Sequence, residues 1–378
     1  MKKIYWRPQS TPLFAFVLIA LFSLAGILAV ERYRMEEERP AYREKVEAAR
    51  LALGAMEAVK DERLRKGITI DAETDPAGSG LIGSYVSAVT TEPGDLDAKQ
   101  TAVNPNFAAV IVDLLRQAKV KEGDAVAVSF SGSFPALNIA VYAAIRTLGL
   151  RPTVISSVGS SQWGANDPAF LWIDMERLLR DRGVFPFRSE AASFGGRHDE
   201  GKEMSERGRR AVLDGVARNG LPMITAGTLH GDIDERMAVY FKKDPPKVYI
   251  NVGGGRAAAG ARPFKVLLRP GLLASDLPAN ARGDSVIARF LKERVPVIQI
   301  YDVKRLAHRY GLPIAPASMP QVGEGTIYYA TRYNRWLAGS VLALIIFGLF
   351  VFSRSDWGFR ILQISSRREE IGPPEPMV

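Results

Sequence analysis

The chain contains no cysteine, and this absence excludes two kinds of architecture. Without a thiol it can form neither a disulfide framework nor a thiolate metal site. The Walker A and G-x-G-x-x-G patterns of nucleotide-binding loops are also missing, so nucleotide binding is not expected. With only 3 histidines in 378 residues, few residues can serve as an imidazole base. The sequence predicts no cofactor, and no metal site is assigned.

Charge of one sign is not concentrated anywhere, although the chain is basic overall. Lys and Arg total 50 against 41 Asp and Glu, which gives a formal net charge of +9. The basic residues alternate with acidic ones and show no aromatic–basic signature, so the sequence predicts no nucleic-acid partner. A basic surface would equally favour an anionic lipid or an acidic polymer.

Two uncharged apolar runs lie near the ends of the chain, at 13–30 and 336–352. Each approaches the roughly 20 residues needed to cross a bilayer, and aromatic residues flank the second run. Both are therefore predicted to be transmembrane helices. The first run is longer than the apolar part of most cleavable signals, which predicts an uncleaved anchor, and a cleaved signal is the alternative. For the second run, a buried core helix is the alternative.

The basic residues after the second run outnumber those before it, which predicts a cytoplasmic C-terminus. The other expected parts are a cytoplasmic N-terminus (1–12), a juxtamembrane helix or stalk (31–66), an extracytoplasmic α/β domain (67–328) and a cytoplasmic tail (353–378). We therefore expect a protein of the inner, cytoplasmic membrane, in contact with membrane lipid, whose central domain lies outside the cytoplasm.

Short apolar segments alternate with helical patterns through the central domain. The strands are expected at 125–130, 153–157, 222–226, 248–252 and 295–301, with helices between them. This alternation is typical of a mostly parallel sheet with helices on both faces. The predicted fold class is α/β with such a sheet, flanked by two transmembrane helices. Long loops are expected at 187–201 and 257–284.

Three loops rich in Gly and Ser follow expected strands, at 131–135, 158–167 and 253–256. In open parallel sheets, ligands bind beyond the carboxyl ends of the strands. Gly lets backbone N–H groups approach a ligand, Ser adds hydroxyl donors, and arginine offers a two-pronged donor for a carboxylate. The candidate ligand-binding residues are Gly132, Ser160, Ser161, Trp163, Asn166, Gly253, Gly254, Gly255 and Arg256. The alternative is that these residues only form tight turns.

A hydrolytic site is a second possibility at the same loops. Ser131 and Ser133 lie where a strand turns into a helix, although the G-x-S-x-G pattern of a nucleophile elbow is absent. A serine nucleophile needs a base, and His230 is the best candidate because Asp232 follows closely. The alternatives are that this His/Asp group holds a metal or that the aspartate caps the following helix.

Several segments resemble the poly-γ-glutamate system protein family. They are 104–110, 132–140, 156–168 and 251–255, and Gly-Ser-Phe-Pro-Ala-Leu-Asn at 132–138 is fairly distinctive. The likeness spans most of the central domain and both terminal apolar segments. It implies a component of the machinery that makes and exports poly-γ-glutamate, and it carries over no active-site residues. That polymer bears one free carboxylate per unit, which a basic domain with Gly/Ser loops suits.

Two functions therefore stand as alternatives. The first is a membrane-anchored accessory component that binds poly-γ-glutamate or its synthase and export subunits. The second is an extracytoplasmic hydrolase or transferase that acts on γ-glutamyl amide bonds, with Ser131 or Ser133 as nucleophile and His230 as base. The sequence leaves open whether the protein catalyses any reaction.

Overall fold

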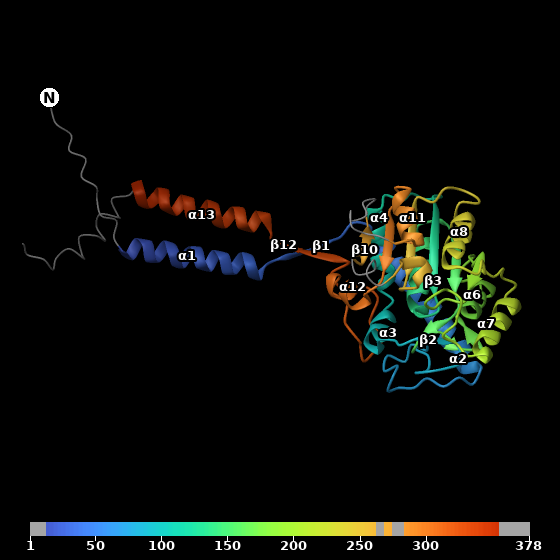
Figure 1. Ribbon diagram of the computed structural model, residues 1–378. Helices are drawn as coiled ribbons and strands as arrows, with labels where there is room; N and C mark the ends of the chain where they lie inside the picture. Colours follow the sequence, from blue (N-terminus) through green and yellow to red (C-terminus); the bar gives the residue numbers. More distant parts are fainter. Residues whose placement is uncertain (1–12, 262–267, 274–282, 355–378) are drawn as a thin grey trace, which may run out of the picture. The chain divides into compact units, whose positions relative to one another are not determined.

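The computed structural model describes residues 13–261, 268–273 and 283–354, except for the side chains of 13–16 and 351–354. It divides into two compact units (Figure 1). A terminal unit takes in the described residues up to Glu37 and from Ala330 onward, and a central unit comprises Glu38–Tyr329. The tail predicted over 1–12, and all but the start of the tail predicted over 353–378, lie outside the described residues.

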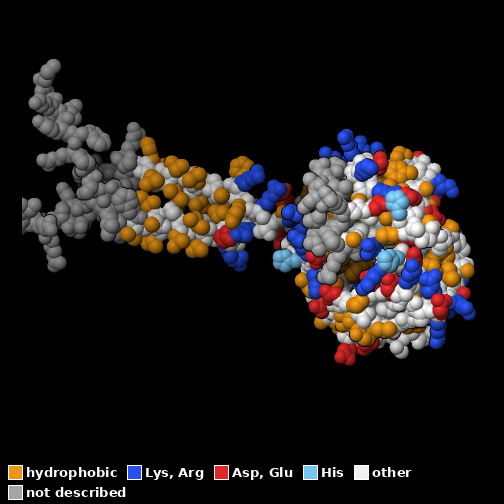
Figure 2. Space-filling view, in the orientation of Figure 1, with side chains coloured by type: hydrophobic (Ala, Val, Ile, Leu, Met, Phe, Trp, Pro, Cys, Tyr) orange, Lys and Arg blue, Asp and Glu red, His pale blue; other side chains and the backbone are white. Residues whose placement is uncertain are grey.

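The terminal unit consists of a helix pair and a strand pair. The helices are α1 (Leu13–Arg32) and α13 (Arg335–Arg354). The strands are β1 (Met35–Glu38) and β12 (Tyr329–Arg332), of which the end residues Glu38 and Tyr329 belong to the central unit. β1 is hydrogen-bonded to β12 in a two-stranded sheet. Hydrophobic side chains cover most of the described surface of the two helices (Figure 2).

Among the described residues, no helix has both the length and the apolar character that crossing a bilayer requires. The two predicted transmembrane helices are therefore wrong, and so is the predicted inner-membrane location with an extracytoplasmic domain. In α1 the described side chains begin at Val17, and Glu31 and Arg32 end the apolar stretch. In α13, Arg335 begins the helix and the described side chains end at Phe350. Each described apolar stretch is shorter than the roughly 20 residues of a typical span.

A six-stranded sheet lies at the centre of the central unit. In order across the sheet the strands are β10 (Gly271–Leu273), β11 (Val297–Ile300), β9 (Val248–Val252), β3 (Ala125–Ser131), β4 (Arg151–Ser157) and β8 (Ala191–Ser193). Neighbouring strands are parallel except β10 and β11, which are antiparallel. The chain therefore has an α/β fold with a mixed sheet.

One edge of the sheet differs from the expected strands. The segment 222–226 contributes only an isolated bridge between Met223 and Ala192. The strand β8 lies within 187–201, where a long loop was expected. Its residues are Ala-Ala-Ser and all three are buried, so β8 has no hydrophobic alternation by which a strand could be recognised.

The direction of winding reverses at β3. From β3 the chain passes through α5 (Pro135–Thr147) to β4, and from β4 through α6 (Trp172–Asp181) to β8. It then runs through α7 (Glu206–Arg218) and α8 (Leu229–Tyr240) and returns to β9, on the other side of β3. In open α/β sheets, the carboxyl ends of the strands at such a reversal are the usual place for a ligand.

Helices cover both faces of the sheet. One face packs against α2 (Tyr42–Arg65), α4 (Phe107–Gln117), α5 and α12 (Val303–Arg309). The other face packs against α8, α9 (Arg256–Ala259) and α11 (Val286–Lys292). Along β3, Val126, Val128 and Phe130 face the first group, and Ala127 faces the second, as the alternation of strand side chains requires.

Residues 31–66, which were expected to form a juxtamembrane helix or stalk, contain α2. The small side chains of Ala48, Ala52 and Ala55 lie one turn apart on this helix and are fully buried in the core of the central unit. Alanine at these positions allows α2 to pack closely against α4 and α5. The helix is therefore an integral part of the domain.

Short elements cover the carboxyl ends of the central strands. They are α3 (Leu96–Ala102), β2 (Thr90–Glu92), β5 (Ser160–Ser161), β6 (Asn166–Asp167) and β7 (Phe170–Leu171). β2 pairs with β5 in parallel, and β6 pairs with β7 in an antiparallel hairpin. In Figure 1, α3 and β2 lie beyond the end toward which β3 points.

Candidate functional site

The loops that follow β3 and β4 pack directly on each other. The carbonyl oxygen of Gly132 accepts hydrogen bonds from Ser160 Oγ at 3.1 Å and from the Ala165 backbone N–H at 2.7 Å. The backbone N–H of Ser161 donates to Ser133 Oγ at 3.0 Å. These bonds hold the two loops together as one structure.

The loop after β9 meets the loop after β3 where the winding reverses. A Cβ atom added to Gly253 would lie 3.2 Å from Ser131 Cβ and 3.9 Å from Phe134 Cδ2. Gly253 has a φ angle of 92°, which side-chain-bearing residues rarely adopt. Glycine is thus required here for both its backbone angle and the close approach. The three Gly/Ser loops therefore gather at the carboxyl ends of the central strands.

Lys99, to which no sequence pattern pointed, links the loops after β3 and β4. From α3, its Nζ donates to the carbonyl oxygen of Ser133 and, at 2.8 Å, to Ser161 Oγ. The same Nζ lies 4.2 Å from the centroid of the Phe134 ring. Lys99 is only 4% exposed, and this burial lowers its pKa to about 7, an effect that the charge of Asp95 partly opposes.

The surroundings of Lys99 give it two chemical capacities. Within the described part of the chain it forms no ion pair, because its partners are a carbonyl, a hydroxyl and an aromatic ring. In its protonated form it can therefore bind an incoming carboxylate. In its neutral form, which is appreciably populated near pH 7, it can accept a proton.

Arg256 is the second cation at this edge of the sheet. It is the first residue of α9, directly after the Gly253–Gly255 loop. Its Nε atom is buried and has no hydrogen-bond partner among the described residues. Buried donors are almost always hydrogen-bonded, so this atom is a candidate donor to the acceptor of a bound ligand. Lys99, Ser131, Ser133, Phe134, Ser161, Arg256 and the Gly253–Gly255 loop are called the carboxyl-edge site below.

Other predicted ligand-binding residues hold a neighbouring segment of the protein. Asn166 is buried, and its Oδ1 accepts from the Ser84 N–H at 2.9 Å while its Nδ2 donates to Ser84 O at 2.7 Å. The ring of Trp163 packs against that of Tyr85, with centroids 5.2 Å apart. The polar groups of Asn166 and of Ser160 are thus satisfied within the protein.

The structure does not bring His230 to the two serines at this edge. His230 lies on α8, its side chain is 72% exposed, and its Nδ1 is 2.6 Å from Asp284 Oδ2. Ser131 Oγ accepts from the Ser133 N–H at 3.2 Å. Among the described contacts neither serine is hydrogen-bonded to His230, as the predicted nucleophile–base pair requires.

Asp232 does not form the helix cap that was one of the alternatives for it. Its side chain is buried, and its Oδ1 accepts from the Ala226 backbone N–H at 2.8 Å. Burial raises the pKa of Asp232. The helix is capped by Thr228, whose Oγ1 accepts from the Gly231 N–H at 3.1 Å. Asp232 therefore supports the turn before α8, and Thr228 provides the cap.

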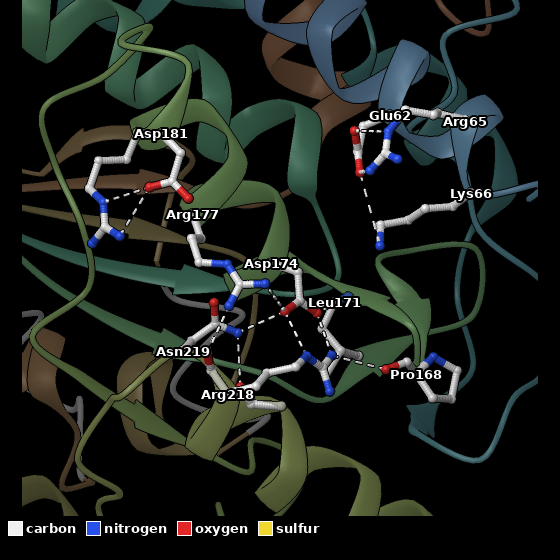
Figure 3. Close-up of polar contacts among 12 residues, drawn as sticks. Glu62, Arg65, Lys66, Pro168, Leu171, Asp174, Arg177, Asp181, Arg218 and Asn219 are labelled. Carbon is white, nitrogen blue, oxygen red and sulfur yellow. Dashed lines mark hydrogen bonds and ion pairs between the residues drawn. The ribbon is translucent and has the colours of Figure 1, made fainter.

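A second polar group surrounds a cavity of about 280 Å³ beside α6. Its lining includes Glu62, Lys66, Phe170, Asp174, Arg177 and Arg218. Figure 3 shows the charged side chains turned toward one another: Asp174 accepts from Arg218 Nε at 2.8 Å and from Asn219 Nδ2 at 2.7 Å. The acidic and basic groups of this site largely neutralise each other. It is therefore less suited to binding an anion than the carboxyl-edge site.

No protein-family model, curated protein or solved structure matches the chain.

Proposed function

We propose that the protein is an accessory component of poly-γ-glutamate synthesis or export, and that its carboxyl-edge site binds this anionic polymer. The observation that carries the proposal is the gathering of three Gly/Ser loops at the winding reversal, with Lys99 and Arg256 beside them. A ligand at this position would meet serine hydroxyls and two cations.

The chemistry of the two cations suits a chain of carboxylates. Hydrogen bonds between a charged donor and a carboxylate are about twice as strong as neutral ones. Arg256 Nε lacks an acceptor among the described residues, and Lys99 has no carboxylate partner there. The amino end of α5 begins at Pro135, next to these groups, and adds a partial positive charge.

The resembling segments also meet at this site. The segments 132–140, 156–168 and 251–255 supply its loops. The segment 104–110 contains the start of α4. Because α4 ends near the amino end of β3, the start of this helix lies at the carboxyl end of the sheet. Three of the four segments that carry the resemblance thus contribute loops to the proposed polymer-binding site, which supports the proposal.

Binding of fluorescently labelled poly-γ-glutamate to the full-length chain tests the proposal. We expect an increase in fluorescence anisotropy at low ionic strength that weakens as salt is added, because the contacts are between charges. Arg256→Gln should weaken binding by about tenfold or more, since one charge-assisted contact contributes roughly 1.5–3 kcal/mol. Lys242→Gln removes the same charge from an exposed position outside the site and should change affinity by less than about twofold.

Absence of binding at low ionic strength would refute the proposal. So would an equal loss of affinity in Arg256→Gln and Lys242→Gln, because binding would then depend on overall charge alone. Circular dichroism of both variants establishes that the comparison is made between folded proteins.

A further inference from the structure

We propose that Ser161 and Lys99 form a nucleophile–base pair that hydrolyses an amide bond. Its identification as a γ-glutamyl amide rests on the polymer-binding function proposed above. The pair differs from the serine–histidine pair that the sequence suggested, because both the nucleophile and the base are other residues.

The geometry singles out Ser161 among the serines of the site. Its Oγ is 2.8 Å from Lys99 Nζ, within the range for proton transfer. Ser131 Oγ instead accepts from the Ser133 N–H, and Ser133 Oγ accepts from the Ser161 N–H. Ser161 is partly exposed, whereas its partner Lys99 is only 4% exposed.

The surroundings of Lys99 hold the amine in a productive orientation. A neutral amine keeps two N–H donors and one lone pair. One N–H can donate to the carbonyl oxygen of Ser133, which leaves the lone pair to accept the proton of the Ser161 hydroxyl. Phe134 and the burial of the side chain exclude water, and burial lowers the pKa of Lys99 to about 7.

The reaction balances with water as the only co-reactant. Lys99 Nζ takes the proton of Ser161 as its Oγ bonds to the amide carbon. The C–N bond then breaks, and the departing amine receives that proton from Lys99. Water next attacks the ester carbon, giving a proton to Lys99, and the C–Oγ bond breaks as Lys99 returns the proton to Ser161. The products are a carboxylic acid and an amine.

Covalent labelling of the full-length chain with a fluorophosphonate, a probe of activated serines, tests the pair. Peptide mapping by mass spectrometry should find the adduct on Ser161. Ser161→Ala should abolish labelling, and Lys99→Met should slow it by about a hundredfold, the usual contribution of a general base. Labelling of the unaltered chain should rise as the pH rises through about 7, where Lys99 becomes neutral.

The matched control is Ser87→Ala. Ser87 lies in the segment that covers the site, and its hydroxyl contacts Thr90 Oγ1 at 3.3 Å and not a lysine. This variant should label at the rate of the unaltered chain. The proposal is overturned if Ser161 stays unlabelled in the folded protein, or if folded Lys99→Met labels as fast as the unaltered chain.

A second measurement tests the Ser161–Lys99 pair if Lys99→Met does not fold. The chain has no cysteine, so Ser161→Cys introduces a single thiol beside Lys99, and Ser87→Cys introduces one away from it. A lysine neighbour stabilises a thiolate, so the thiol at 161 should react with iodoacetamide at lower pH than an ordinary thiol of pKa about 8.5. Identical pH profiles for the two thiols would overturn the pair.

The outcomes separate this inference from the proposed function. Polymer binding without serine labelling overturns the Ser161–Lys99 pair and leaves the binding function intact. Serine labelling without polymer binding keeps the pair and removes the γ-glutamyl substrate class. Release of free carboxyl and amine groups from poly-γ-glutamate, lost in Ser161→Ala, would support both.

Discussion

Lys99 and Arg236 are both buried cations of the central unit, and their surroundings shift their pKa values in opposite directions. Arg236 is 2% exposed, forms an ion pair with Asp199 and donates to Ser193 Oγ at 2.6 Å. Burial alone would lower the pKa of Arg236, but the charge of Asp199 and its hydrogen bond raise it. Lys99 is bonded to a carbonyl and a hydroxyl, and burial lowers its pKa to about 7.

The difference separates a structural charge from a chemically available one. A buried cation that is fully paired is fixed in its charged state, and removing either partner leaves an uncompensated charge. A buried amine without an acid partner can exchange its proton near neutral pH, and it is free to bind an anion when charged. Four predictions test this contrast between the surroundings of Arg236 and those of Lys99.

The largest effect is expected at Arg236. Replacing it by methionine leaves the Asp199 carboxylate, which is almost completely buried, without its counter-ion. We expect the free energy of unfolding to fall by about 3–5 kcal/mol at neutral pH, measured by urea denaturation.

The double variant Arg236→Met/Asp199→Asn is the control for this prediction. Removing both charges should recover part of the lost stability, because no isolated charge remains buried. A loss below about 1 kcal/mol in Arg236→Met would show that the ion pair does not anchor the core.

Lys99 should make stability depend on pH in a way that Arg236 does not. Its pKa is about 7 in the folded protein, against an ordinary value of 10.5. Between these values the unfolded chain binds the extra proton, so this lysine makes stability rise with pH by up to about 1.4 kcal/mol per unit. Below pH 7 both states are protonated and the dependence disappears.

Urea denaturation of Lys99→Met across this range measures that contribution. The difference in unfolding free energy between the unaltered chain and Lys99→Met should change by about 2 kcal/mol between pH 7.5 and 9. Lys242→Met, which removes an exposed lysine, should give a curve parallel to that of the unaltered chain. Parallel curves for Lys99→Met would mean that Lys99 titrates as an ordinary lysine.

Much of the central unit follows from patterns in the sequence. The strand predicted at 248–252 has those bounds, and the one predicted at 125–130 extends by one residue to Ser131. Both are buried on either face and are apolar apart from Asn251 and Ser129, a pattern typical of a central parallel strand. At the edges the signal fails, because β8 is a run of small residues and 222–226 forms a single bridge.

The candidate site was less accessible from the sequence. The loops could be placed at one edge because the carboxyl ends of parallel strands must meet there. Lys99 lies in the polar segment Asp95–Gln100, where a lysine is indistinguishable from a solvated one. Its burial arises from Ser133 and Ser161, which are distant in the sequence. No local pattern encodes such contacts.

Replacing Phe134 by leucine removes the aromatic ring beside the Lys99 ammonium. This variant tests whether the ring stabilises the charged form of Lys99, as Asp199 stabilises that of Arg236. A desolvated cation–π contact contributes up to about 2 kcal/mol to the charged form. Because that form dominates below pH 7, Phe134→Leu should cost more stability at pH 6 than at pH 9. Phe241→Leu, which loses a ring stacked on Phe290, should cost the same at both values. Equal costs at the two pH values for Phe134→Leu would exclude a contribution of the ring to the charge state.

The smallest effect is expected at Asp95, whose charge is what keeps the pKa of Lys99 from falling further. Asp95 is also the N-cap of α3, where its side chain accepts from the Ala98 N–H, and asparagine caps a helix equally well. Asp95→Asn therefore removes the charge and keeps the cap, so the pKa of Lys99 should fall while the fold is retained. NMR titration of the lysine ¹³Cε resonances, with Lys99→Met to assign the signal, measures the change. Asp97→Asn is the control, because it removes a neighbouring exposed carboxylate that does not act on Lys99. An equal fall of the Lys99 pKa in that variant would show that the effect comes from overall charge and not from Asp95.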